Sequence, residues 1–182
     1  MDVNSFLSLV AARQSDRAYD KTRQVEPEKL HRILEAARLA PSACNAQPWK
    51  FVVVTDPELA VLVGKATAGL GMNKFAKHAP VHILIVEESM NITSFLGARI
   101  KDKYFPLIDI GIAASHITLA AESEGLGSCI LGWFDENEIK RLVGIPSNKR
   151  LLLDITVGYP VKPKRKKSRK PADKVISYNS YK

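Results

Sequence analysis

The stretch Pro41-Ser42-Ala43-Cys44-Asn45-Ala46-Gln47-Pro48-Trp49 lies between a periodic apolar segment and a β-branched one. Residues 27–40 before it carry apolar side chains at helical spacing and begin with a proline, which suits the first turn of a helix. Residues 49–55 after it are rich in valine and predict a strand. A non-helical stretch between two buried elements must satisfy its own backbone groups or present them to a ligand. From the residues alone, a polar turn is the alternative.

Helical and strand patterns alternate along the rest of the chain. Strands are predicted over residues 81–86, 129–134 and 151–157, and the first of these is apolar enough to be buried on both faces. Helices are predicted over residues 59–68, 107–125 and 136–143, of which the second is the longest and ends with Gly125 as its cap. An amphipathic first helix is expected with Asn4 as its N-cap. This alternation predicts a mixed α and β protein built in layers.

Residues 87–104 mix aromatic and basic groups without clean periodicity, which predicts a loop or a loose helix. We expect Phe95 to Phe105 to cover a pocket.

The composition predicts one globular domain over residues 1–182, because 46% of the residues are hydrophobic and 25% are charged. No stretch approaches the roughly 20 apolar residues that a membrane-spanning helix needs. The first residues carry no positive segment of the kind that begins a signal peptide, so we expect a cytoplasmic protein that does not contact membranes. The two cysteines, Cys44 and Cys129, indicate neither a disulfide framework nor a zinc site.

The net charge of +8 is concentrated in one C-terminal segment, residues 162–170. This basic segment holds seven of the 27 lysines and arginines, so the remainder of the chain carries a net charge of only +1. The distribution does not favour nucleic acid as the partner, although non-specific binding, steering of an anionic substrate and plain solvation remain alternatives for most of the segment.

Arg13-Gln14-Ser15-Asp16-Arg17 places two guanidinium groups around a hydroxyl in a short turn. Arginine suits phosphate because its planar fork binds two oxygens at once, although a solvated loop is the alternative. A dinucleotide fingerprint is not indicated, since Gly125, Gly127 and Gly132 have the wrong spacing and run from a helix into a strand.

Taken in order, these segments resemble the FMN-dependent nitroreductase family. The resemblance covers essentially the whole chain and rests on the two motifs above together with four further pieces: Ala79-Pro80, Asp109-Ile110-Gly111, residues 120–128 and Lys167-Ser168-Arg169. It implies an α+β fold, a three-layer α/β/α sandwich with a mainly antiparallel central sheet. It also implies an intertwined homodimer with FMN at the interface.

The resemblance further implies which residues bind FMN. Those expected around its phosphate are Arg13, Arg17, Lys167 and Arg169. Gln14 and Ser15 are expected near the ribityl chain or the ring edge, as is Asn73. Leu131 and Gly132 are expected to pass over the flavin, with a backbone N–H, that of Gly132, near its reactive nitrogen. The other subunit is expected to supply Ser42, Ala43 and Asn45 from the stretch quoted above, which also contains the candidate binding residues Pro41 and Gln47.

The activity implied is transfer of a hydride from NADH or NADPH through FMN to an acceptor such as a nitroaromatic or a quinone. No metal and no acid or base side chain is expected to take part. Some family members carry an acidic residue where Leu131 precedes Gly132. Other chemistry on the same scaffold, namely reductive dehalogenation or oxidation of a peptide-bound ring, is an alternative, as is a flavin-binding module with little turnover.

Overall fold

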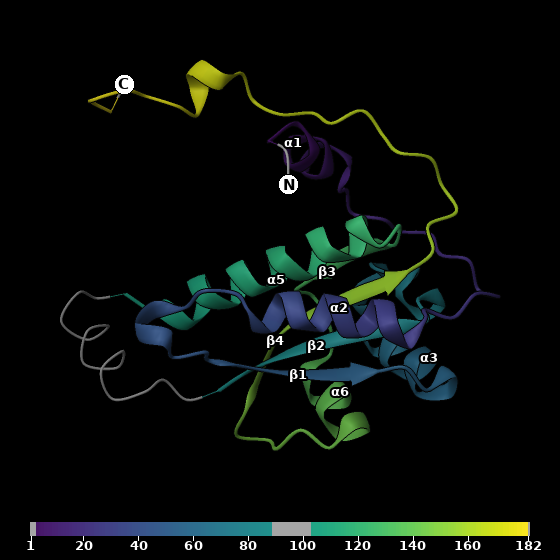
Figure 1. Cartoon of the computed structure of the whole chain (residues 1–182). Coiled ribbons are helices and arrows are strands. Elements are labelled where there is room, and N and C mark those ends of the chain that lie inside the picture. Colours follow the sequence, from purple (N-terminus) through teal and green to yellow (C-terminus); the bar gives the residue numbers. More distant parts are fainter. Residues whose placement is uncertain (1–2, 89–102, 182) are drawn as a thin grey trace.

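The computed structural model describes residues 3–88 and 103–181. Its centre is an antiparallel sheet of four strands in the order β1-β2-β4-β3. The strands are β1 (Trp49–Val54), β2 (Val81–Glu87), β3 (Gly127–Leu131) and β4 (Arg150–Gly158). Helices α2 (Pro27–Arg38) and α5 (Phe105–Ser123) cover one face, and α3 (Pro57–Ala66) and α6 (Glu136–Val143) cover the other (Figure 1). The predicted three-layer α/β/α arrangement with an antiparallel sheet is confirmed.

Strand β2 separates the two halves of the core. Ile83 and Ile85 pack with α2 and α5 on one face, whereas Leu84 and Val86 pack with α3 and α6 on the other. Alternate side chains of a strand point to opposite faces, so a strand covered by helices on both sides must be apolar throughout. This burial explains the continuous apolar pattern of residues 81–86.

A buried polar cluster joins β2, β4 and α3. His82 Nδ1 lies 2.9 Å from Asp154 Oδ2, and the Thr67 hydroxyl donates to the same oxygen at 2.8 Å. All three side chains are fully buried. Buried polar groups persist in a core when they satisfy one another, and here they fix the register of the sheet against the end of α3.

Some helix and strand boundaries in the structure differ from the predicted ones. Helix α1 (Val3–Ala12) already contains Asn4, so Asn4 is not its N-cap as expected. Strand β3 was expected to begin at Cys129 and to continue to Phe134. It instead begins at Gly127, paired with Gly158, and its last paired residue is Leu131. The early start follows from the left-handed turn at Gly125 (φ 74°), which redirects the chain into the sheet directly after α5.

Helix α5 corrects the expectation about membrane-spanning segments. It has 19 residues and is long and apolar enough to cross a bilayer by length and composition. In the structure it packs against α2, β2 and β3, with Ile110, Ala114 and Ile117 among its buried residues. A central helix in contact with several elements carries apolar residues around much of its circumference, which accounts for its composition.

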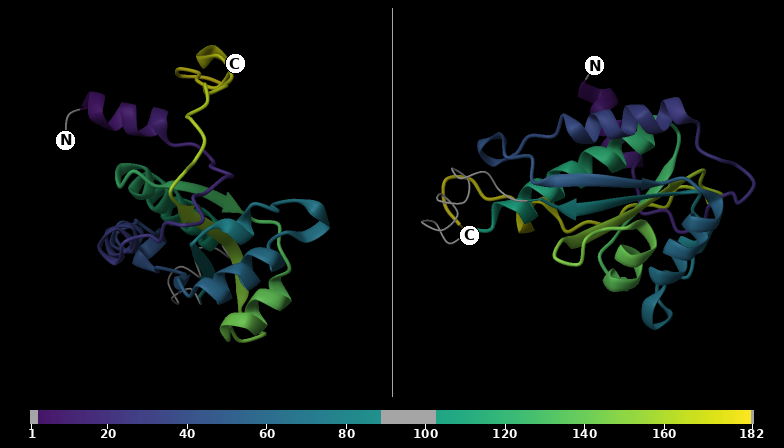
Figure 2. Two further views of the ribbon diagram at one scale, coloured as in Figure 1. Left: turned by 90° about the vertical axis from the view of Figure 1, so that its right-hand side faces the viewer. Right: turned by 90° about the horizontal axis from the view of Figure 1, so that it is seen from below.

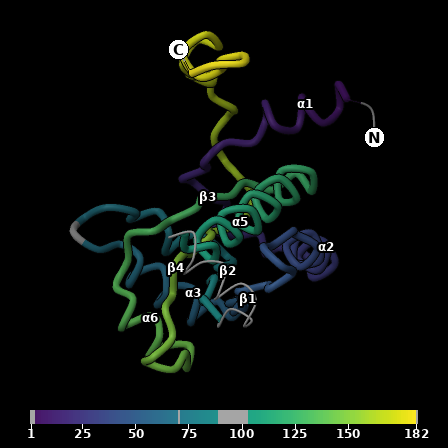
Figure 3. The backbone as a smooth tube through the Cα atoms, turned by 90° about the vertical axis from the view of Figure 1, so that its left-hand side faces the viewer, coloured from purple at the N-terminus to yellow at the C-terminus, as the bar shows by residue number. Residues whose placement is uncertain are grey.

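The two ends of the chain stand away from the layered body. Helix α1 lies beyond α5, and the C-terminal segment after β4 runs past the same side of the molecule (Figures 1 and 2). None of the ten residues of α1, all of which the structure describes, is buried. Figure 3 shows the same two segments projecting above α5 and β3. The segment Phe95 to Phe105, expected to cover a pocket, lies outside the described residues as far as residue 102.

Candidate cofactor site

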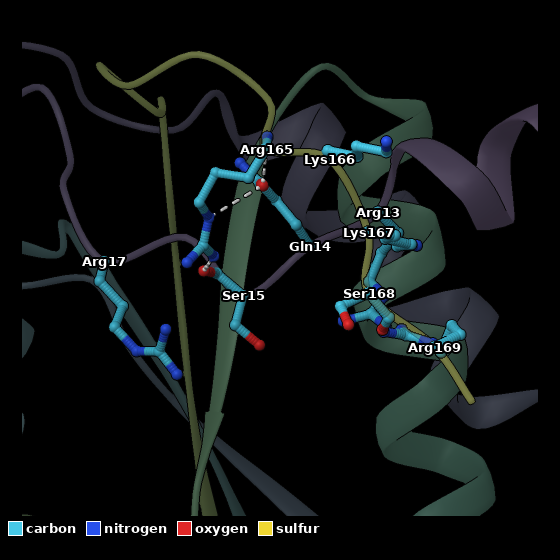
Figure 4. Close-up of a pocket in the computed structure, with 9 residues that line it drawn as sticks. All are labelled: Arg13, Gln14, Ser15, Arg17, Arg165, Lys166, Lys167, Ser168 and Arg169. Atoms are coloured by element: carbon cyan, nitrogen blue, oxygen red, sulfur yellow. Dashed lines mark hydrogen bonds between the residues drawn. The ribbon is translucent and has the colours of Figure 1, made fainter.

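A basic pocket forms where the two ends of the chain meet beside β3. Ser15 forms a parallel bridge with Ser128 of β3, and the Asp16 amide donates to the Ser128 carbonyl at 2.8 Å. The C-terminal basic segment then returns across this strand-like stretch. Together they enclose about 340 Å³, lined by Arg13, Gln14, Ser15, Arg17, Arg165, Lys166, Lys167, Ser168 and Arg169 (Figure 4). The structure therefore brings six of the predicted cofactor residues into one pocket.

The charges of this pocket are all positive. In Figure 4 the side chains of Arg13, Lys167 and Arg169 lie close together, and Arg17 lies on the other side of the Ser15 hydroxyl. Desolvation, together with the neighbouring charges of Arg13 and Arg169, lowers the pKa of Lys167. Mutual repulsion of this kind is relieved by an anion, and arginine and lysine are the side chains that best bind phosphate. The pocket thus fits the phosphate of FMN.

Gln14 differs from its neighbours because both polar atoms of its side-chain amide form hydrogen bonds with other residues of the chain. Its Nε2 donates to Asp16 Oδ1 at 2.7 Å, and its Oε1 accepts from the backbone N–H of Arg165 at 3.0 Å. The residue is 9% exposed. Gln14 therefore faces the C-terminal segment, and Ser15 is the residue of this pair whose hydroxyl is directed into the pocket (Figure 4).

The Pro41–Pro48 stretch forms a tight irregular turn. Its backbone is left-handed at Cys44 (φ 51°), Asn45 (φ 51°) and Gln47 (φ 46°), a conformation that residues other than glycine adopt infrequently. Ser42 Oγ accepts a hydrogen bond from the backbone N–H of Gln47 at 2.9 Å. The turn leaves Asn45 and Gln47 exposed at the surface, together with Pro41.

The turn and the basic pocket lie at opposite ends of α5. The Ala43 amide donates to Asp109, in the first turns of α5, at 3.1 Å. Lys164, at the edge of the basic pocket, pairs with Glu122 in the last turn of the same helix at 2.5 Å. Thirteen residues of α-helix span about 20 Å, at 1.5 Å per residue. One chain therefore does not bring these two groups of predicted residues together.

The end of β3 carries the remaining predicted residues. Asn73, also left-handed (φ 55°), donates through its side chain to the Trp133 carbonyl at 3.1 Å and so lies beside Gly132. The Leu131 side chain is buried with Ala76 and Cys129, and Leu131 pairs with Asp154 of β4. A Cβ added to Gly132 would find its nearest neighbour, Leu153 Cδ2, 4.0 Å away. Among the residues that the structure describes, none covers the surface over Gly132 closely.

Three residues of the pocket were not predicted as cofactor residues, namely Arg165, Lys166 and Ser168. Arg165 and Lys166 belong to the basic run, and Ser168 lies within Lys167-Ser168-Arg169, the part of the run that matched the family pattern. Which cations of a run face a ligand depends on how the chain returns to the body, and spacing along the sequence does not encode that return.

Comparisons with known proteins show which family the chain matches. The family model described as "Nitroreductase family" matches residues 10–71 and 62–159. An oxygen-insensitive NADPH nitroreductase of Helicobacter acinonychis is 28% identical over 198 residues, covering 93% of this chain and 94% of its own. An iodotyrosine deiodinase of Thermotoga neapolitana is 29% identical over 176 residues, covering 85% and 87%. The solved structure of an FMN-dependent nitroreductase from Clostridium difficile R20291 is 30% identical, with a TM-score of 0.74 over 96% of this chain and 99% of that one.

Proposed function

Because this chain belongs to the nitroreductase family and is therefore an FMN-dependent oxidoreductase, we propose that it passes reducing equivalents from NADH or NADPH to a small organic acceptor. The observation that carries the proposal is the basic pocket of about 340 Å³, to which both ends of the chain contribute cations. It lies beside Ser128 in β3, and the exposed Gly132 follows the other end of the same strand. Nitroaromatics and quinones are the proposed acceptor classes, and the proposed compartment is the cytoplasm.

The proposed FMN lies along β3. Its phosphate binds Arg13, Lys167 and Arg169, whose charges otherwise repel one another. Ser15 lies between this group and Arg17 (Figure 4). The ring then extends toward Gly132 and Asn73, since Ser128 beside Ser15 and Gly132 beyond Leu131 mark the two ends of the same strand.

The proposed site is completed by a second copy of the chain. The turn with Ser42, Ala43, Asn45 and Gln47 lies about 20 Å of helix away from the basic pocket of its own chain. Helix α1 exposes Phe6, Leu7 and Val10, and α5 exposes Leu107 and Ile108. A homodimer would bury these apolar side chains and bring the turn of one copy to the pocket of the other.

FMN, when bound, supplies the redox chemistry by accepting a hydride from a nicotinamide and returning it to the acceptor. The residues of this chain bind FMN and orient it. The cations hold the phosphate, and the open backbone at Gly132 allows a flat ring and a substrate to approach closely. No side chain of the pocket needs to act as an acid or a base.

Reductive dehalogenation is a second candidate, favoured by the similarity to the deiodinase from Thermotoga neapolitana. Release of halide from a halogenated phenol by the reduced protein separates this candidate from nitroaromatic or quinone reduction.

The test is the visible absorption spectrum of the purified protein before and after addition of NADH and NADPH under argon. Flavin bands that bleach with either nucleotide, and return when a quinone or a nitroaromatic is added, support the proposal. Steady-state kinetics should then be ping-pong, because donor and acceptor use the same pocket in turn. Bands that persist with both nucleotides would refute pyridine nucleotides as reductants.

A further inference from the structure

Arg165 makes more contacts with the Arg13–Arg17 stretch than the pocket's other cations do. Its backbone N–H donates to Gln14 Oε1 at 3.0 Å, and its Nε reaches the same oxygen at 3.3 Å. Its Nη2 donates to the Ser15 carbonyl at 2.7 Å. In Figure 4 the guanidinium turns inward over Gln14 and Ser15. Its backbone N–H and two nitrogens of its guanidinium, Nε and Nη2, therefore all donate to the Arg13–Arg17 stretch.

The acceptor of Arg165, Gln14 Oε1, is held in place by a second hydrogen bond of the same side chain. Gln14 Nε2 donates to Asp16 Oδ1 at 2.7 Å, which turns Oε1 toward the C-terminal segment. Asp16 is 4% exposed and is packed against Gly127, where an added Cβ would lie 2.7 Å from Asp16 Oδ2. A buried carboxylate and amide with fixed rotamers give Arg165 a rigid partner.

The C-terminal segment needs such a partner because it has little packing of its own. Every described residue after Pro160 is exposed except Lys167, which is half-buried. A segment without buried apolar contacts gains its order from a few polar contacts. Lys167 and Arg169 can face the same phosphate as Arg13 only if the segment is fixed at its entry to the pocket.

We propose that Arg165 is a positioning residue that clamps residues 165–169 onto the Arg13–Arg17 stretch through Gln14, and so assembles the phosphate site from the two ends of the chain. The inference rests on the proposed function for its ligand. The clamp itself is present in the protein without FMN, so it has a test of its own.

The first measurement is FMN affinity by quenching of flavin fluorescence. Arg165→Lys keeps the charge but loses the fork that joins Gln14 to the Ser15 carbonyl. We expect Arg165→Lys and Arg165→Ala to weaken binding alike, by about tenfold or more, since hydrogen bonds to charged groups have effects of this size. Lys162→Ala, which removes a charge from the same exposed segment outside the pocket, should change affinity by less than about twofold.

The second measurement is hydrogen exchange of the peptide covering residues 161–171 in the FMN-free protein. Arg165→Lys and Gln14→Ala should both speed exchange at the Arg165 amide, and combining the two should add little to either. If Gln14→Ala lowers stability by leaving Asp16 unpaired, the exposed Arg165→Lys change carries the test alone.

Affinity and exchange that stay at the wild-type level in Arg165→Lys would overturn the clamp, because a residue acting only by its charge behaves in this way. A wild-type protein that takes up no FMN would instead refute the proposed function, and the exchange experiment would still decide whether the clamp exists.

Discussion

Gly132 is a residue for which the fold alone gives no need of a glycine. Its φ is not in the left-handed range, and an added Cβ would lie 4.0 Å from the nearest heavy atom. Gly127, five residues earlier, is the opposite case. A Cβ there would lie 2.7–2.9 Å from the buried Asp16 side chain. One glycine is thus required by the chain's own packing, and the other leaves space for something outside the chain.

We predict that Gly132→Ala leaves the melting temperature of the FMN-free protein within about 2 °C of wild type, since the added methyl group displaces none of the described residues. The same change should weaken FMN binding or slow reduction of bound flavin about tenfold or more, because the methyl group would occupy the approach to the ring. Thermal unfolding without FMN and a stopped-flow reduction with NADH measure the two effects. As a contrast, Gly127→Ala should lower the melting temperature of the FMN-free protein.

If Gly132→Ala bound and reduced flavin as wild type does, the ring would not pass over this residue. Leu131 and Asn73 would then lose their proposed roles as well.

Arg13, Arg17, Lys167 and Arg169 were expected around one phosphate from the resemblance to the family pattern, and the structure places all four in one pocket. Their binding of FMN stays a prediction. The roles of Gln14 and Arg165 could not be predicted, because they depend on a contact between residues 151 positions apart. Sequence spacing carries no information about which of seven neighbouring cations makes that contact.

Among the elements, α1 has a composition that the described chain leaves unexplained. Phe6 and Leu7 are 47% and 58% exposed, and they share one side of the helix with Val3 and Val10. Ser5 and Ser8 lie on the other side. An apolar stripe on a helix is normally buried, and none of the described elements buries this one. A second copy of the chain is the cover that the proposed site requires.

We predict that Leu7→Glu converts the proposed dimer into a monomer, because a carboxylate buried without a partner is strongly unfavourable. The far-ultraviolet circular dichroism should change little, since Leu7 is exposed in the described structure. Light scattering after size-exclusion chromatography measures the mass, and Ser8→Glu on the opposite side of α1 serves as the matched control.

A wild-type protein that is monomeric at micromolar concentration would contradict the dimer directly. A Leu7→Glu variant that remained dimeric would place the interface elsewhere than on α1.

The bounds of the elements show where periodicity is informative. Helix α6 was predicted to the residue, and α2, α3 and β2 to within two residues at each end, because long apolar patterns and the Asp56-Pro57 start are local signals. The end of β3 was predicted wrongly, because Trp133 and Phe134 have strand-like side chains but lie beyond the last pairing with β4. The end of a strand depends on its pairing with a neighbouring strand, which the residue types at that end do not indicate.

At the scale of the whole molecule, the layered fold follows from the alternation of elements, but the antiparallel character of the sheet was expected only from the resemblance to a family. The strand order β1-β2-β4-β3 was not predicted and comes from the structure. The division of the proposed site between two chains rests on the length of α5. The basic pocket lies at the end of this helix that holds Glu122, and the Pro41–Pro48 turn lies at the end that holds Asp109.

This division makes a specific prediction for mixed dimers. Arg13→Ala removes a phosphate contact and should cost roughly 1.5–3 kcal/mol of FMN binding. Asn45→Gly removes the side chain offered by the turn while keeping its left-handed backbone. Each variant alone should bind FMN weakly at both of its sites.

An FMN titration of the heterodimer of these two variants, purified through two different affinity tags, tests directly whether two chains share each FMN site. If each site combines Arg13 of one chain with Asn45 of the other, one site of the heterodimer is fully wild type and the other carries both changes. We predict wild-type affinity at half of the sites, although neither parent shows it. A heterodimer without any site of wild-type affinity would contradict the shared site and would confine FMN binding to the residues of one chain.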